Sequence, residues 1–285
     1  MIRSVSTAFR RASMLMITTA AFLGLAAALS QQSSPEEGSG AGDAAFSIGE
    51  KLEYRIEWDP PWYFFFLPRM DAGDVFLSIP EEIDQNGRKA VTIEFKAKSS
   101  GTLANLTGFK IDDDFRFVAD AATLCSISSS MKQREGKRKR DIEVVYLPQT
   151  KQLHIHEADV AVNPPVVKKD AYKDGIPECV QDIFSALYWL RRQELNVGMK
   201  FKSVLGYGDR VKEVESIIER IEWVETPLGR NEAFRMNTVA LMGGLFKDGG
   251  QFKIWLSVDR RKLPLQFEVN VSLGKVVGKL RRIEG

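Results

Sequence analysis

The sequence predicts a mainly β protein: an antiparallel curved sheet, closed as a barrel or open as a half-barrel, with one amphipathic helix near residues 178–195. Three observations support this fold class. Apolar and polar residues alternate with a period of two along most of the chain after residue 45, turn residues separate these runs, and one segment has helical spacing. Short strands at regular spacing are typical of an antiparallel sheet that curls on itself.

The N-terminal residues have the order of a secretory signal peptide. Three arginines precede an apolar run from Met14 to Leu29, and small residues follow that run. The run is short for a membrane span, which needs about 20 residues. We therefore interpret residues 1–30 as a signal that directs export to the periplasm or cell envelope. Cleavage and retention as an anchor are both open.

The remaining chain divides by composition. Residues 31–45 are rich in Ser, Gly, Pro and Glu and lack aromatic side chains, which is typical of a flexible tether. Residues 46–285 are long enough for a single β-rich domain, or for two lobes arranged around the helix at 178–195.

Charge excludes one class of partner. The chain has 40 basic and 38 acidic residues, and three of the arginines lie in the predicted signal. Without that segment 37 basic and 38 acidic residues remain, a net charge of −1. A chain this close to neutral lacks the basic surface that bulk binding to nucleic acid requires.

Strands are expected wherever the alternation is clear. Leu52 to Trp58 and Val91 to Ala97 both place apolar side chains on one face, and an Asn-Gly pair at 86–87 predicts a hairpin. Strands follow at short spacing over 126–160. Beyond Gly198 the expected strands are 199–207, 211–225, 230–241, 251–258, 263–271 and 275–283. The segment 211–225 also fits helical spacing, but its isoleucines and Trp-Val pair favour a strand.

The helix has recognisable ends. Pro177 precedes it, acidic residues lie in its first turns, and two arginines and Gly198 mark its end. An apolar stripe at helical spacing requires burial against the sheet or across the mouth of a barrel. Cys125 and Cys179, the only cysteines, are candidates for a disulfide in an exported protein; the alternative is two buried thiols.

The segment "WDPPWYFFFLP" raises a separate question. As a strand it would place Trp62, Phe64 and Phe66 on one face and other apolar side chains on the opposite face. Apolar area of this extent is rarely left in water. We therefore expect these residues to be buried, with the helix or neighbouring strands, a ligand or membrane surface, or a partner protein covering the second face.

Polar clusters give weak signals of chemistry. His154 and His156 share a strand face but lack specified further ligands, so neither a metal site nor a cofactor is predicted. The run Asp112–Asp114 is interpreted as a solvated strand start, because consecutive residues face opposite sides of a strand. The basic run Lys132–Arg140 fits a solvated hairpin or contact with anionic headgroups. The two glycines of Gly206–Val211 do not complete a dinucleotide-binding loop.

Several stretches resemble an exported bacterial family known as domain of unknown function 3108. They are "FSIGEKLEYRIEW", "MDAGDVFLSI", "QDIFSALYWLRR", "EWVETPLG" and "IWLSVDRRKLPLQFEV". The resemblance implies fold and export and supplies no catalytic residues. The aromatic run departs from the family pattern. The closing strand pair also resembles that of lipoprotein carriers, half-barrels with a hydrophobic cavity under a helical lid, which is a likeness of fold alone.

These observations together favour a non-catalytic envelope protein that binds a hydrophobic or lipid-like molecule in the concavity of the sheet, with Trp62, Phe64 and Phe66 as candidate contacts. Peripheral membrane contact is compatible with this hypothesis. Two alternatives are a module that docks an envelope protein through the aromatic patch, and a carboxylate-dependent hydrolase of an envelope polymer. The last requires two close acids, one with a raised pKa.

Overall fold

A computed structural model describes residues 45–62, 66–85, 87–108, 110–239, 251–271 and 274–285. Phe64 lies outside the described residues, as do the predicted signal and all but the last residue of the predicted tether. The described residues fall in one compact unit, Ala41–Gly285. Within them, no helix is long and apolar enough to cross a membrane.

Strands dominate this unit, as the alternation predicts. Their bounds are β1 Lys51–Asp59, β2 Met70–Ser78, β3 Glu82–Gln85, β4 Arg88–Ser99, β5 Asp112–Asp120, β6 Ser126–Glu135, β7 Arg138–Leu147, β8 Gln152–Asp159, β9 Val166–Asp174, β10 Lys200–Tyr207, β11 Arg210–Thr226, β12 Gly229–Val239, β13 Gln251–Ser257, β14 Pro264–Asn270 and β15 Lys275–Glu284.

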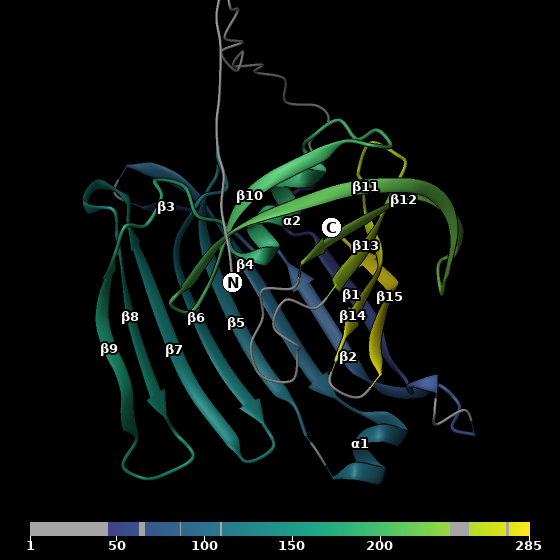
Figure 1. The fold of residues 1–285 in the computed structure, drawn as a ribbon, viewed down its shortest axis with the longest axis horizontal. Helices are drawn as coiled ribbons and strands as arrows, with labels where there is room; N and C mark the ends of the chain where they lie inside the picture. The colour runs from purple at the N-terminus through teal and green to yellow at the C-terminus, as the bar shows by residue number, and fades with distance from the viewer. Residues whose placement is uncertain (1–44, 63–65, 86, 109, 240–250, 272–273) are drawn as a thin grey trace, which may run out of the picture. The chain divides into compact units, whose positions relative to one another are not determined.

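All the strands belong to one antiparallel sheet. Its order is β10-β11-β12-β13-β14-β15-β1-β2-β4-β5-β6-β7-β8-β9, with β3 paired to β4 beside this path. The first and last strands in the sequence, β1 and β15, are therefore neighbours near the middle of the sheet. Figure 1 shows the sheet curving, with β6 to β9 (teal) on one side, β13 to β15 on the other, and β10 and β11 passing above α2.

The sheet is not closed into a barrel. In the described ladder, β9 and β10 are the two edges, and neither is paired to the other. Side chains cross the gap between them: Lys169 forms an ion pair with the Asp209 carboxylate, and the Lys173 Nζ donates to the Asp209 carbonyl at 2.7 Å. Asp209 lies in the turn between β10 and β11, so this contact ties one edge of the half-barrel to the other.

The predicted helix is present and shorter than expected. Helix α2 spans Ile183–Arg191, and the other residues of the predicted 178–195 segment lie outside the helix. Backbone bonds explain this, because the Val180 carbonyl accepts from Ser126 at 2.7 Å and the Gln181 amide donates to Val204 at 2.9 Å. The Asp182 carboxylate then caps the helix by accepting from the first free amides.

Two elements were not expected from the sequence. Helix α1 spans Gly101–Thr107, a single short segment between β4 and β5. Strand β9 is largely exposed and carries charged residues on both faces, so it lacks the alternation that marks the other strands. It pairs with β8 alone, as an edge strand that lysines protect from further pairing.

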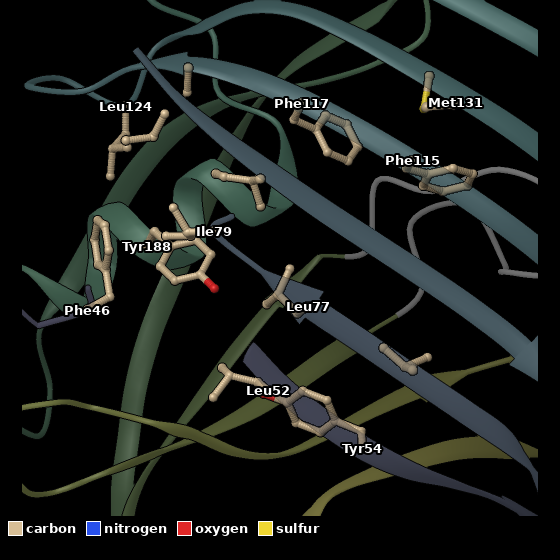
Figure 2. Close-up of a cluster of buried hydrophobic side chains, with 14 of the residues drawn as sticks. Phe46, Leu52, Tyr54, Leu77, Ile79, Phe115, Phe117, Leu124, Met131 and Tyr188 are labelled. Carbon is tan, nitrogen blue, oxygen red and sulfur yellow. The ribbon is translucent and has the colours of Figure 1, made fainter. Parts of the chain in front are cut away.

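The core lies between the concave face of the sheet and α2. Figure 2 shows Tyr188 of α2 beside Ile79, while Leu52, Leu77, Phe115 and others project from the strands toward the same space. A second cluster joins the end of α2 to β11, β12 and β13, and contains Leu190, Leu195, Ile218, Met236, Ile254 and Leu256. The apolar stripe of α2 is therefore covered by the sheet, as its amphipathic spacing predicts.

Two connections hold α2 in place. Cys125 and Cys179 form a disulfide with a Cα–Cα distance of 5.1 Å, which joins the segment before α2 to the start of β6. At the other end, the buried Arg191 guanidinium bonds the Glu50 carboxylate at 2.6 and 2.8 Å. Both connections fix the position of α2 relative to the sheet.

Candidate ligand-binding cavity

The main cavity of the described residues lies between α2 and the concave face of the sheet. Its volume is about 770 Å³, which is within the range of about 300–1,000 Å³ for small-molecule sites. Most of its wall is apolar. The side chains that form its centre include Tyr54, Ile56, Phe115, Phe184, Leu187 and Phe267. Alternation explains this wall, because the inward-facing residues of each strand meet on the concave side.

One glycine makes room for an aromatic wall. Phe267 of β14 pairs in register with Gly278 of β15. A Cβ at Gly278 would lie 2.2 Å from the Phe267 ring, so only glycine lets the ring lie flat across β15. Tyr54 lies beside the same ring, with centroids 5.5 Å apart, and its hydroxyl donates to the Pro264 carbonyl at 2.8 Å.

The cavity reaches the surface at one end of the sheet. Trp58 pairs with Met70, and Lys98 pairs with Asp112, so the end of β1, the start of β2 and the end of β4 lie together. Trp58, Met70 and Lys98 all line the cavity, and Lys98 is exposed. The cavity therefore extends to this rim of the sheet.

Polar side chains gather on the cavity wall near this rim. Asp113 of β5, Gln133 and Glu135 of β6, and Tyr207 of β10 all line the cavity. Asp113 and Glu135 are each 8% exposed, and Gln133 is 1% exposed. The Gln133 Nε2 donates to the Tyr207 hydroxyl at 2.5 Å. The Gln133 Oε1 has no hydrogen-bond partner within the described part of the chain.

Burial governs the titration of these groups. Desolvation raises the pKa of Asp113 above its ordinary value, against the opposing effect of a hydrogen bond from the Arg134 amide at 2.6 Å. Desolvation also raises the pKa of Glu135, and the nearby Asp113 adds to that rise. Burial raises the pKa of Tyr207, so its hydroxyl stays neutral.

Neighbouring arginines only partly compensate the two acids. Arg134 directs its guanidinium to the Asp141 carboxylate at 2.6 Å, and Arg140 forms an ion pair with Glu157. Arg138 is nearer, with Nη1 3.9 Å from the Glu135 Oε2, which is beyond hydrogen-bond distance. The Asp113–Glu135 acid pair therefore faces an apolar cavity with little direct neutralisation.

The aromatic run is placed differently from the prediction. Trp62 is 86% exposed and Phe66 is 66% exposed, in the connection between β1 and β2. The prediction that the helix or neighbouring strands cover these residues is wrong for both, and Phe64 lies outside the described residues. Prolines on either side oppose strand pairing by the described residues of this connection, since proline cannot donate to a ladder. Leu67, from the same connection, lines the cavity.

The histidines form a polar face without a metal-binding cluster. The His154 Nε2 lies 2.7 Å from Asp170 Oδ1, and the His156 Nδ1 lies 3.5 Å from Asp170 Oδ2. Hydrogen bonds from these rings hold the pKa of Asp170 below its usual range. No group of three or more potential metal ligands occurs among the described residues.

The other polar runs form hairpins. Lys132–Arg140 spans the turn between β6 and β7, as predicted, and Gly206–Val211 spans the turn between β10 and β11. Inside the first run, however, alternation turns Gln133 and Glu135 inward. In the same way, Asp113 is buried while Asp112 and Asp114 are exposed. The interpretation of the aspartates as a solvated strand start is therefore wrong for Asp113.

One solved structure is similar in fold to this chain at low sequence identity. No curated protein matches the chain. A β-barrel-like protein of the DUF1849 domain of unknown function, from Brucella abortus, has a TM-score of 0.53 at 10% identity, covering 82% of this chain and 96% of that one. A Bacteroides fragilis protein described as a candidate exported protein with a YmcC-like fold has a TM-score of 0.34 at 10% identity, covering 84% of this chain and 97% of that one.

The sequence also identifies a family. The model of the family described as "Protein of unknown function (DUF3108)" matches residues 53–281, from the first strand through most of the last. The match agrees with the resemblance carried by the strand and helix motifs of the sequence. The chain therefore belongs to the DUF3108 family.

Proposed function

We propose that this protein is a non-catalytic, exported envelope protein that binds a hydrophobic or lipid-like molecule in the cavity between α2 and the sheet. The observation that supports it is the apolar cavity of about 770 Å³ that reaches the surface beside β1 and β2. A ligand buried there would gain about 0.8 kcal/mol for each CH₂ removed from water.

Export in this proposal rests on the signal-like residues 1–30 and is consistent with the disulfide between Cys125 and Cys179. Disulfides form and persist in oxidising compartments such as the bacterial periplasm. A mature N-terminus near residue 31, found by intact mass measurement of protein purified from the envelope fraction, would support export. Full-length protein confined to the cytoplasm would contradict it.

Binding is tested with N-phenyl-1-naphthylamine, a neutral dye that fluoresces in apolar sites. Delipidated protein should bind it saturably. Ala97→Phe, which fills the cavity wall, should weaken binding at least tenfold, and Lys96→Phe is the matched control on the opposite face of β4. Equal binding by the two variants would contradict the proposal. Ala186→Phe on α2 provides a second cavity-filling variant if Ala97→Phe fails to fold.

The exposed aromatic side chains suggest how a ligand enters. Trp62 and Phe66 lie in the connection that also supplies Leu67 to the cavity wall, and aromatic rings of this kind are common at membrane interfaces. A Trp62→Ser/Phe66→Ser variant should lose binding to lipid vesicles and retain dye binding. Loss of a protein complex, with vesicle binding unchanged, would instead support the adaptor alternative.

One observation favours a hydrolase as a second candidate: Asp113 and Glu135 are buried acids that both have raised pKa values. The apolar wall fits an envelope polymer less well than an acyl chain. Release of reducing ends from purified cell-wall glycan, abolished in Asp113→Asn, would support this candidate. No release by the wild-type protein at any pH between about 4 and 8 would rule it out.

A further inference from the structure

We propose that Asp113, Gln133 and Glu135 bind the protonated amine of a single-chain amphiphile whose hydrocarbon chain occupies the cavity. This inference rests on the proposed function, because it names the chemistry of the ligand for the same cavity. It concerns the polar part of the wall, which an entirely apolar ligand would leave unused.

The first step of the argument is the unpartnered amide. Gln133 is 1% exposed and lines the cavity, yet its Oε1 accepts no hydrogen bond within the described part of the chain. A buried polar atom without a partner costs about 1–3 kcal/mol, so such an atom points to a donor supplied by a ligand or water.

The second step is the balance of charge around the acid pair. Asp113 and Glu135 are both buried and face the same cavity. The other charged or titratable groups that act on them are Asp112, Arg134, Arg138, Arg140 and Tyr207. Lys98 and Asp74 also line the cavity.

Two of those arginines have other acceptors, and the third, Arg138, keeps its Nη1 3.9 Å from the Glu135 Oε2. The Arg134 guanidinium donates to the Gln133 and Arg140 carbonyls at 2.8 and 2.9 Å and pairs with Asp141. Arg140 pairs with Glu157. Within the described residues, a cation inside the cavity would therefore meet two acids that accept no direct hydrogen bond from an arginine side chain.

The third step is the match of donors to acceptors. A primary ammonium has three N–H donors. The wall offers three acceptor groups: the Asp113 carboxylate, the Glu135 carboxylate and the Gln133 amide oxygen. An anionic head group, such as a carboxylate or phosphate, would be repelled by the same acids. A quaternary ammonium would carry the same positive charge but has no N–H group to donate in a hydrogen bond.

The test uses four probes with the same dodecyl chain: dodecylamine, dodecyltrimethylammonium, dodecanol and laurate. Each displaces N-phenyl-1-naphthylamine from the protein at pH 7, below the concentration at which the probe forms micelles. We expect dodecylamine to bind at least tenfold more tightly than dodecanol and dodecyltrimethylammonium, and laurate to bind most weakly. Equal affinities for dodecylamine and dodecanol would overturn the inference and leave the cavity proposal intact.

Three variants locate the head group. Asp113→Asn/Glu135→Gln and Gln133→Leu should each reduce the preference for dodecylamine over dodecanol at least fivefold. Asp114→Asn is the matched control, because it makes the same change on the exposed face of β5. Retained preference in both the double variant and Gln133→Leu would overturn the inference. Absence of dye binding by folded wild-type protein would refute the cavity proposal itself.

Discussion

The ion pair between Arg191 and Glu50 gives the sharpest stability prediction, because it joins the end of α2 to the start of β1 inside the core. The Arg191 side chain is fully buried and donates to both Glu50 oxygens, to the Ala45 carbonyl at 2.7 Å and to the Arg261 carbonyl at 3.0 Å. Replacing it with Met would leave the Glu50 carboxylate buried without its partner.

Loss of one member of a buried pair costs about 3–5 kcal/mol. We expect Arg191→Met to lower the free energy of unfolding by this amount, measured by urea denaturation without reductant at pH 7. Adding Glu50→Leu should recover part of the loss, since the lone charge is then absent. Lys200→Met is the control: it removes an exposed ion pair to Glu215 at 3.0 Å and should cost less than about 1 kcal/mol.

A loss below about 1 kcal/mol for Arg191→Met would refute this reasoning. It would mean that water or a neighbouring group replaces the guanidinium without cost, and that α2 is held by packing and the disulfide alone. A double variant less stable than either single variant would contradict the assignment of the penalty to the unpaired carboxylate.

Three further predictions concern stability. Replacing Cys125 and Cys179 by Ser should cost about 4 kcal/mol, because the bond closes a sequence separation of 54 residues; an unchanged urea midpoint would contradict this. The pKa values of Asp113 and Glu135 are raised in the folded state, so both acids favour folding when they are protonated. This contribution to the free energy of unfolding is fully present below about pH 4 and is lost as pH rises through the folded-state pKa values. Asp113→Asn/Glu135→Gln should therefore lose less stability than wild type between about pH 4 and 7, and parallel profiles would disprove the effect. Gly206→Ala should cost about 1–3 kcal/mol, since its Cβ would lie 2.3 Å from a tyrosine hydroxyl; a neutral effect would show that the strand can shift.

Periodicity predicted most of the sheet because each strand buries one face. The expected strands from 199 to 283 match β10 to β15 closely within the described residues, and 211–225 is the strand that its isoleucines favoured. Composition could not predict β9, because an exposed edge strand has no buried face to produce alternation. Periodicity also placed the start of the helix too early. The helix starts at Ile183 because the backbone of Val180 and Gln181 forms hydrogen bonds with β6 and β10, strands that are distant in sequence.

The candidate site was harder to predict than the fold. Aromatic content directed attention to Trp62, Phe64 and Phe66, and the described members of this set are exposed. The polar wall instead comes from Asp113 and Glu135, which lie in charged runs that look solvated in sequence. Their inward direction could have been found from register, because Asp113 lies two residues before Phe115 and four before Phe117, which are apolar positions on the same face.

Alternation places the Gln133 side chain inward, but its missing hydrogen-bond partner had no sequence signal. A glutamine between Lys132 and Arg134 looks like part of a solvated hairpin. Its burial depends on β10, where Tyr207 lies against it from a segment 74 residues later in the chain. Contacts of such separation are visible only when the sheet has curved and brought β6 and β10 to the same cavity.

The most direct test of the account is a crystal structure of the protein grown with dodecylamine. We predict a continuous alkyl chain between α2 and the sheet, with its nitrogen about 2.7–3.2 Å from the carboxylates of Asp113 and Glu135 and from the Gln133 Oε1. An unoccupied cavity at a dodecylamine concentration that saturates dye displacement, or an alkyl chain bound only on the outer face of the sheet, would contradict the account.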